Sequence, residues 1–267
     1  MNARACEKEF DSSDSMKRYT KHILPVGMSV LLAIVVAIVL FQRRQQPLIP
    51  VSLAADLSAD CCQVLLVLSP QPKSVSARMW LMQRANAQSP WRCERGPVAV
   101  SLGRNGLAWG IGEHRSAAPY GFAMKREGDG CSPAGVFRLP FAFGYAAFSE
   151  AGWVRLPYVH VTATLFGVDD MASRYYNQVI DATTVTCDWN SDETMLRADG
   201  LYRWGAFVAN NPANERGAGS CIFLHIWRGP GKPTAGCTTM PQQELQHVLA
   251  WLDVSKSPRL VQSVTGW

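Results

Sequence analysis

A cysteine in a short stretch rich in glycine and threonine is the strongest candidate for chemistry in this sequence. Cys237 lies in KPTAGCTTM, residues 232–240, and His225 precedes it by twelve residues in the tripeptide HIW. A thiol and an imidazole within hydrogen-bond reach can act together, because the imidazole accepts the thiol proton and later returns it to a leaving amine. Cys237 is therefore the candidate nucleophile and His225 the candidate acid and base. The alternative is a buried structural cysteine near a core histidine.

The residues that follow and precede Cys237 suit a reactive thiol. Residues 241–253 carry apolar side chains at i, i+3, i+4 and i+7, which predicts an amphipathic helix. A thiol just before that helix lies at the positive end of the helix dipole, which favours the thiolate. Gly236 has no Cβ, so the loop backbone can approach a substrate carbonyl and direct its amides at an oxyanion. Thr239-x-x-Gln242 further predicts a capping box.

The N-terminal part of the chain predicts export. Residues 23–41 contain no charged side chain, and their length approaches the about 20 residues that an α-helix needs to cross a bilayer. Basic residues precede this segment, which favours a cytoplasmic tail over residues 1–22. The rival interpretation is a signal peptide, because Ser52-Leu53-Ala54 resembles a cleavage site. We expect a bacterial envelope protein, anchored in the inner membrane with a periplasmic domain or secreted to the periplasm.

Composition excludes several other classes of protein. The net charge is only +5 and the basic residues are scattered, so we expect no nucleic-acid partner. No cysteine and histidine spacing is typical of zinc, and we expect no metal and no cofactor. Export would leave Cys6 in the cytoplasm and seven of the eight cysteines outside, which permits up to three disulfides beside one free thiol. Cys93 is a candidate partner for one of the vicinal pair Cys61-Cys62.

Beyond a linker over residues 42–62, short apolar runs predict one mainly β domain over residues 63–267. Asn105-Gly106 predicts a β-hairpin between two of these runs, 98–102 and 107–109. The other strand candidates are bounded by turn-forming residues: residues 64–68, 78–84, 135–139, 159–165, 204–209, 221–226 and 259–264.

Four stretches then occur in a recognisable order. They are KREGDGCSPAGVFRL (125–139), DDMASRYYN (169–177), GLYRWGAFVANN (200–211) and HIW followed by TAGCTTM. Together they resemble the L,D-transpeptidase catalytic domain, often called the YkuD domain, from about residue 64 to the C-terminus. The resemblance implies a mainly β fold, a sandwich or flattened barrel with a few short helices, whose cysteine loop lies in a cleft.

The resemblance also implies a reaction. Cys237 would attack the carbonyl of the third residue, a diamino acid, in a peptidoglycan stem tetrapeptide. That step expels D-alanine and leaves a thioester, which an amine of a second stem resolves into a 3–3 crosslink. His225 carries over as the acid and base. Gly236 and Cys237 carry over as backbone oxyanion donors, and Thr234 as a hydroxyl that braces the loop.

Two positions depart from the commonest family form, Ser-His-Gly-Cys-x-Arg. Ala235 replaces the histidine, and Thr239 replaces an arginine that could hold a substrate carboxylate with two hydrogen bonds. Branches without this arginine include proteins that resemble amidases or carboxypeptidases. The transpeptidase is our prediction. Two alternatives stay open: a cysteine hydrolase that cuts stem peptides or their link to an envelope lipoprotein, and a non-enzymatic peptidoglycan-binding scaffold in which Cys237 is disulfide-bonded or idle.

Overall fold

Strands form most of the regular structure. The computed structural model of the protein describes Leu31 and residues 47–266. Residues 47–267 form one compact unit, and residues 1–46 belong to another, of which only Leu31 is described. The described elements are the helices α2 (Val51–Ala55) and α3 (Gln242–Trp251), the 3-10 helix η1 (Val254–Lys256), and the strands β1 (Gln63–Ser69), β2 (Ser76–Gln83), β3 (Arg92–Ser101), β4 (Leu107–Trp109), β5 (Ser132–Arg138), β6 (Ala142–Gly144), β7 (Tyr158–His160), β8 (Leu165–Val168), β9 (Gln178–Asp181), β10 (Asp192–Thr194), β11 (Trp204–Phe207), β12 (Phe223–Ile226), β13 (Thr238–Met240) and β14 (Arg259–Val264).

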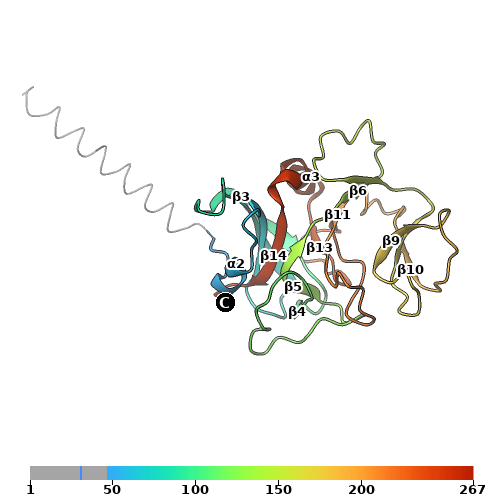
Figure 1. Ribbon diagram of the computed structural model, residues 1–267, viewed down its shortest axis with the longest axis horizontal. Helices are drawn as coiled ribbons and strands as arrows, with labels where there is room; N and C mark the ends of the chain where they lie inside the picture. The colour runs from blue at the N-terminus through green and yellow to red at the C-terminus, as the bar shows by residue number, and fades with distance from the viewer. Residues whose placement is uncertain (1–30, 32–46, 267) are drawn as a thin grey trace, which may run out of the picture. The chain divides into compact units, whose positions relative to one another are not determined.

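The described strands form one large sheet and one small sheet. The order of the large sheet is β4-β5-β14-β1-β2-β3-β13-β12-β11-β6-β7, and that of the small sheet is β10-β8-β9. β14 pairs in parallel with β1, and β12 pairs in parallel with β13. Figure 1 shows β9 and β10 at one side of the unit, away from β14. The fold is therefore mainly β with few short helices, as predicted.

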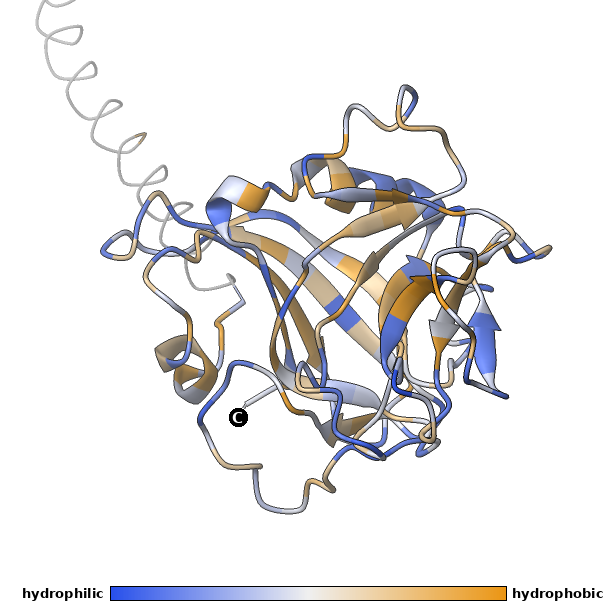
Figure 2. Cartoon of the chain, turned by 45° about the vertical axis from the view of Figure 1, so that its right-hand side comes forward, coloured by the Kyte–Doolittle hydropathy of each residue, from blue (hydrophilic) through white to orange (hydrophobic). Residues whose placement is uncertain are grey.

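Two groups of buried apolar side chains fill this unit. The larger group lies around β1 and β14 and includes side chains from α2 and α3. The smaller group lies around β6, β8, β11 and β12, and Cys237 belongs to it. β1 is buried along its whole length, which is typical of a strand covered on both faces. In Figure 2 the strands carry much of the apolar colour, and the connecting loops carry more of the polar colour.

The predicted hairpin at Asn105-Gly106 is wrong. The turn itself exists, because the Gly106 N–H donates to the carbonyl of Gly103 at 2.9 Å. However, β4 pairs in parallel with β5, and β3 pairs with β2 and β13. The Leu107 N–H donates a hydrogen bond to the carbonyl of Pro72 at 2.7 Å. The chain after the turn therefore pairs elsewhere and not with β3.

The other strand predictions are largely confirmed, with one division. The run at residues 159–165 is interrupted, because Leu165 N–H bonds the carbonyl of Thr162 in a turn between β7 and β8. The remaining predicted runs coincide with described strands in whole or in part: β1, β2, β3, β5, β11, β12 and β14.

The predicted C-terminal helix is present, but its relation to Cys237 differs from the prediction. α3 buries Leu245, Val248 and Leu249, which confirms the apolar stripe. The predicted capping box is wrong, because Thr239 lies in β13 and no side chain bonds the first turn of α3. β13 also separates Cys237 from α3 by a strand of about 10 Å, at about 3.3 Å per residue. The thiol therefore does not lie at the helix N-terminus.

Part of the predicted linker belongs to the folded unit. Residues 51–55 form α2, whose Leu53 is fully buried. Just after α2, the carboxylate of Asp56 accepts a hydrogen bond from the Ser116 hydroxyl at 2.8 Å. The unit accordingly begins at Pro47 and not at residue 63.

The predicted membrane span, residues 23–41, lies outside the described residues apart from Leu31. Within the described part of the chain, the helices are too short or too polar to cross a bilayer.

Leu53→Ala is expected to destabilise the unit, because α2 packs its one fully buried side chain against the core. Truncation of a buried leucine costs about 2–5 kcal/mol. Val51→Ala is the matched control, since Val51 is 85% exposed on the same helix and should change stability by less than about 0.5 kcal/mol. Urea unfolding of residues 47–267 measures both variants. Equal stability of the two would show that α2 is not part of the core.

Candidate active site

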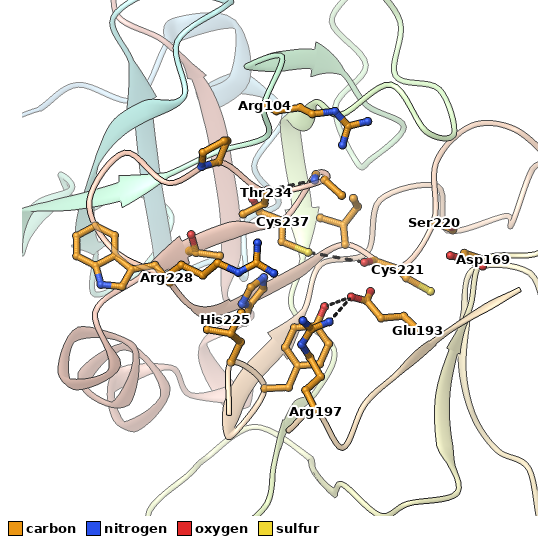
Figure 3. A pocket seen from close by; sticks show the side chains of 18 of the residues that line it. Arg104, Asp169, Glu193, Arg197, Ser220, Cys221, His225, Arg228, Thr234 and Cys237 are labelled. Atoms are coloured by element: carbon orange, nitrogen blue, oxygen red, sulfur yellow. Dashed lines mark hydrogen bonds and ion pairs between the residues drawn. The ribbon is translucent and has the colours of Figure 1, made fainter. Parts of the chain in front are cut away.

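Two neighbouring strands bring Cys237 and His225 to one cavity. β12 and β13 run in parallel, with His225 opposite Thr239. Cys237 immediately precedes β13, and its Sγ accepts a hydrogen bond from the Phe223 N–H at 3.4 Å. Phe223 and His225 are two residues apart on β12, so their side chains share one face. Both predicted residues line the same cavity, and Figure 3 shows the imidazole beside Cys237.

His225 offers an unprotonated ring nitrogen to this cavity. Its Nδ1 lies 2.8 Å from the carbonyl oxygen of Ile226. A carbonyl oxygen only accepts, so Nδ1 carries the proton and Nε2 keeps its lone pair. No described residue forms a hydrogen bond with Nε2. Burial lowers the pKa of His225 to about 4, so the imidazole is neutral at pH 7 and able to accept a proton.

The Cys237 thiol is also neutral in the free protein. Burial, followed by the nearby carboxylate of Glu193, raises the pKa of Cys237 to about 12, although the Phe223 N–H acts in the opposite direction. At pH 7 the thiol is then almost entirely protonated. The predicted activation by a helix dipole is wrong, because α3 begins beyond β13. In the free protein both groups are therefore neutral, and the Cys237 thiol would have to lose its proton to act as a nucleophile.

Hydroxyl groups hold the backbone at Cys237. The Thr234 hydroxyl donates to the Cys237 carbonyl at 2.6 Å, so Thr234 braces the loop. The Ser132 hydroxyl, from the first residue of β5, donates to the same carbonyl at 3.2 Å. Ser132 lies in the stretch KREGDGCSPAGVFRL, which explains why that motif accompanies the cysteine loop.

The two predicted oxyanion donors differ in their availability. Gly236 N–H donates to the Thr234 hydroxyl at 3.1 Å and is already occupied. For the Cys237 N–H, no hydrogen bond to another described residue is present, so this donor is not already occupied. Gly236 has a packing role as well, since a Cβ there would come within 3.0 Å of the Ile222 Cδ1.

Charged side chains surround the thiol in a cavity of about 470 Å³. In Figure 3, Arg228 lies on the side of Cys237 away from Glu193 and Asp169, and Arg104 lies above Cys237. Arg228 makes no hydrogen bond or ion pair with any described residue, so its charge is available to a ligand. The other charged residues that line the cavity are Lys125, Glu127, Arg197 and Lys232.

The structure adds residues that the sequence reasoning missed. Tyr202 packs its ring edge-on against His225, at 4.9 Å between ring centroids, and donates its hydroxyl to Glu193. Tyr202 lies in the stretch GLYRWGAFVANN. The family resemblance therefore pointed to this segment but gave Tyr202 no role. Glu193 lies in none of the four stretches, and no sequence signal pointed to it. Asn177, the last residue of DDMASRYYN, accepts the Cys221 N–H at 3.0 Å and so fixes the start of β12.

The disulfides that the cysteine count permits are not formed among the described residues. All seven cysteines among the described residues are free thiols. Cys93 Sγ faces the carbonyl of Arg95 at 3.5 Å, and Cys62 Sγ faces that of Ala85 at 3.9 Å. Cys237 Sγ lies 3.9 Å from the carbonyl of Cys221. The nucleophile candidate is thus not blocked by a disulfide.

No protein-family model, no curated protein and no solved structure matches this chain. Function is therefore argued from the geometry and chemistry of the site, since a fold alone does not specify an activity.

Alkylation of Cys237 is expected to lack the signature of an activated thiolate. Because burial holds its pKa near 12, the rate of reaction with iodoacetamide should rise steadily with pH up to pH 10. Mass spectrometry of the Cys237 peptide measures this rate, with the exposed Cys187 as an internal reference for reagent. A plateau below pH 8 would contradict the neutral resting thiol.

Proposed function

We propose that the protein is a peptidoglycan L,D-transpeptidase with Cys237 as its nucleophile, on a YkuD-type β fold. The observation that carries the proposal is the neutral thiol and imidazole pair in one cavity, beside the free N–H of Cys237. A nucleophile, a base and a donor for an oxyanion are the groups that acyl transfer from an amide requires. The four motifs supply the substrate class, the stem tetrapeptide.

The first half-reaction makes the thioester. As Sγ attacks the carbonyl carbon of the third stem residue, the thiol proton passes to Nε2 of His225. The carbonyl oxygen becomes an oxyanion that the Cys237 N–H can stabilise. The carbon–nitrogen bond to D-alanine then breaks, and the imidazolium donates its proton to the leaving amine.

The second half-reaction releases the enzyme. The side-chain amine of a second stem attacks the thioester carbonyl and loses a proton to Nε2. The carbon–sulfur bond breaks, and the proton returns to Sγ. Water in place of the amine would leave a tripeptide, so the acceptor decides between crosslinking and hydrolysis.

Arg228 and Lys232 can bind a substrate carboxylate in place of the missing family arginine. Both line the cavity and neither is paired with a described residue. The position of that arginine is taken by Thr239, whose hydroxyl instead faces the carbonyl of Ser101 at 3.4 Å. Guanidinium and ammonium groups are the usual partners of carboxylates. The terminal carboxylate of the tetrapeptide is the group we assign to them.

The cell envelope is the place where this reaction is expected. The apolar segment 23–41 and the basic residues before it support an inner-membrane anchor with the catalytic unit in the periplasm, or a secreted form. In the periplasm, peptidoglycan stems would be both the acyl donor and the acyl acceptor. The alternative substrate for the same thioester chemistry is a stem linked to an envelope lipoprotein.

Incubation of residues 47–267 with disaccharide-tetrapeptide tests the reaction itself. We expect crosslinked dimers that have lost one alanine, detected by mass spectrometry. Cys237→Ala should abolish them, whereas Cys187→Ala, which changes an exposed cysteine, should not. Tripeptide alone would replace the transpeptidase with a carboxypeptidase. No product in any sample would contradict both activities on this substrate.

His225→Gln should lower kcat/KM by about 10²–10⁴-fold, the usual contribution of general acid–base catalysis. Glutamine retains a polar side chain of similar size but cannot accept the thiol proton. His160→Gln is the matched control, because His160 lies in β7 outside the cavity. Equal losses in the two variants would remove His225 from the mechanism.

The acidic limb of the pH profile should lie near pH 4. A protonated His225 cannot accept a proton, and its pKa is lowered to about 4. Activity should therefore persist as the pH falls through 6 and decline only as it approaches 4. The dependence of kcat/KM on pH measures this limb. A decline centred near pH 6.5 would show that His225 is not held in its neutral form.

A further inference from the structure

The small sheet places a carboxylate in the cavity for which the proposed acyl transfer has no use. Glu193 belongs to β10 and lies opposite Gly167 of β8. Its side chain is 30% exposed, and it lines the same cavity as Cys237. Asp169, just after β8, lines this side of the cavity too, as Figure 3 shows.

The negative charge of Glu193 is only partly balanced by its neighbours. Arg197 Nη1 lies 3.6 Å from Glu193 Oε1, but Arg197 makes a closer pair with Asp199, at 2.6 Å. The Tyr202 hydroxyl donates a hydrogen bond to Glu193 without adding charge. Asp169 adds a further negative charge. A cation in the cavity would therefore find a carboxylate that is not fully neutralised.

A carboxylate at this position hinders the nucleophile of the free protein. A negative charge near a thiol disfavours the thiolate, and Glu193 follows burial as the largest influence that raises the pKa of Cys237. A group that opposes the reaction in the free protein becomes useful if the substrate cancels its charge. The free state would then be protected from side reactions of the thiol.

A second feature offers a polar ligand a partner in this cavity, the imidazole of His225. His225 is only 7% exposed, yet its Nε2 has no hydrogen-bond partner among the described residues. Only the Ser101 and Ser263 hydroxyls are fully enclosed without a partner among the described residues, so Nε2 is open to the cavity that Glu193 lines. It can accept a hydrogen bond from a ligand there.

We propose that Glu193 binds an ammonium group of the substrate and that this contact makes Cys237 reactive. The identity of the substrate rests on the proposed function, because the diamino acid of a stem peptide carries a side-chain ammonium. When the ammonium meets the carboxylate, the two charges cancel at the thiol. The thiol proton then passes to Nε2 of His225 as Sγ attacks. Glu193 is thus a specificity-determining residue that links recognition to reactivity.

The first test measures thiol reactivity without peptidoglycan. Iodoacetamide carries no charge, so its approach is not steered by Glu193. Glu193→Gln keeps an acceptor for the Tyr202 hydroxyl and removes the charge. Alkylation of Cys237 at pH 8 should then be faster than in the unaltered protein, by up to about tenfold for each unit by which the pKa falls. Equal rates in the two proteins would overturn the proposal.

Two control variants separate charge from packing. Glu193→Asp keeps the charge and should be alkylated at close to the original rate. Asp192→Asn removes a carboxylate from the same strand, and Asp192 does not line the cavity. It should leave the rate unchanged. If either control variant were alkylated as fast as Glu193→Gln, looser packing around the thiol would explain the effect. That outcome would contradict a role for the charge of Glu193.

The second test supplies the cation. Acetyl-lysine amide carries an ammonium group, whereas acetyl-norleucine amide has the same chain without it. The lysine compound should accelerate alkylation of Cys237 in the unaltered protein but not in Glu193→Gln, and the norleucine compound should accelerate neither. Equal effects of the two compounds would overturn the assignment of an ammonium site. If these alkylation results were obtained but no reaction with disaccharide-tetrapeptide were detected, the proposed function would be contradicted. The ammonium site at Glu193 would still stand.

Discussion

The candidate site depends on the parallel pairing of β12 with β13. This register puts Cys237 Sγ against the Phe223 N–H and places His225 two residues further along the same face. Gln262 of β14 stabilises the arrangement from the core, because its amide joins the Thr238 hydroxyl to the carbonyl of Pro133, each at 2.8 Å. A shift of one residue in register would turn the side chains to the opposite face. The relative placement of Cys237 and His225 thus rests on sheet geometry and on the hydroxyls that hold the loop before β13.

Burial explains the protonation state of both candidate residues, Cys237 and His225. A poorly solvated site disfavours charge on either group, so the thiol keeps its proton and the imidazole stays neutral. An ion pair would be present before substrate arrives only if nearby charges outweighed that effect. The charges that line the cavity are mixed, with Glu193 opposing the thiolate and Arg228 on the other side. Under the proposed function, the reactivity of Cys237 would depend on how a bound substrate changes this balance of charge.

Local patterns in the sequence predicted the elements, and long-range contacts decided the site. Uninterrupted apolar runs identified strands such as β1, and the apolar stripe identified α3. The resemblance to the family motif, together with the order of His225 and Cys237, identified the candidate pair, and it also marked Thr234. The predicted hairpin at Asn105-Gly106 was wrong because turn residues predict a turn but not which strands pair on either side of it. β4 pairs with β5 and not with β3. Glu193 could not be found, because the small sheet that brings it to Cys237 is visible only in the fold.

The most direct test of the account is the mass of the intact protein during turnover. Residues 47–267 are mixed with disaccharide-tetrapeptide, and the reaction is quenched in acid. Mass spectrometry then measures the intact protein, and peptide mapping locates the adduct. The account predicts an acyl adduct of the disaccharide-tripeptide on Cys237, formed as D-alanine is released, and none in Cys237→Ala. Turnover without an adduct on Cys237, or with an adduct on another residue, would contradict the assignment of the nucleophile.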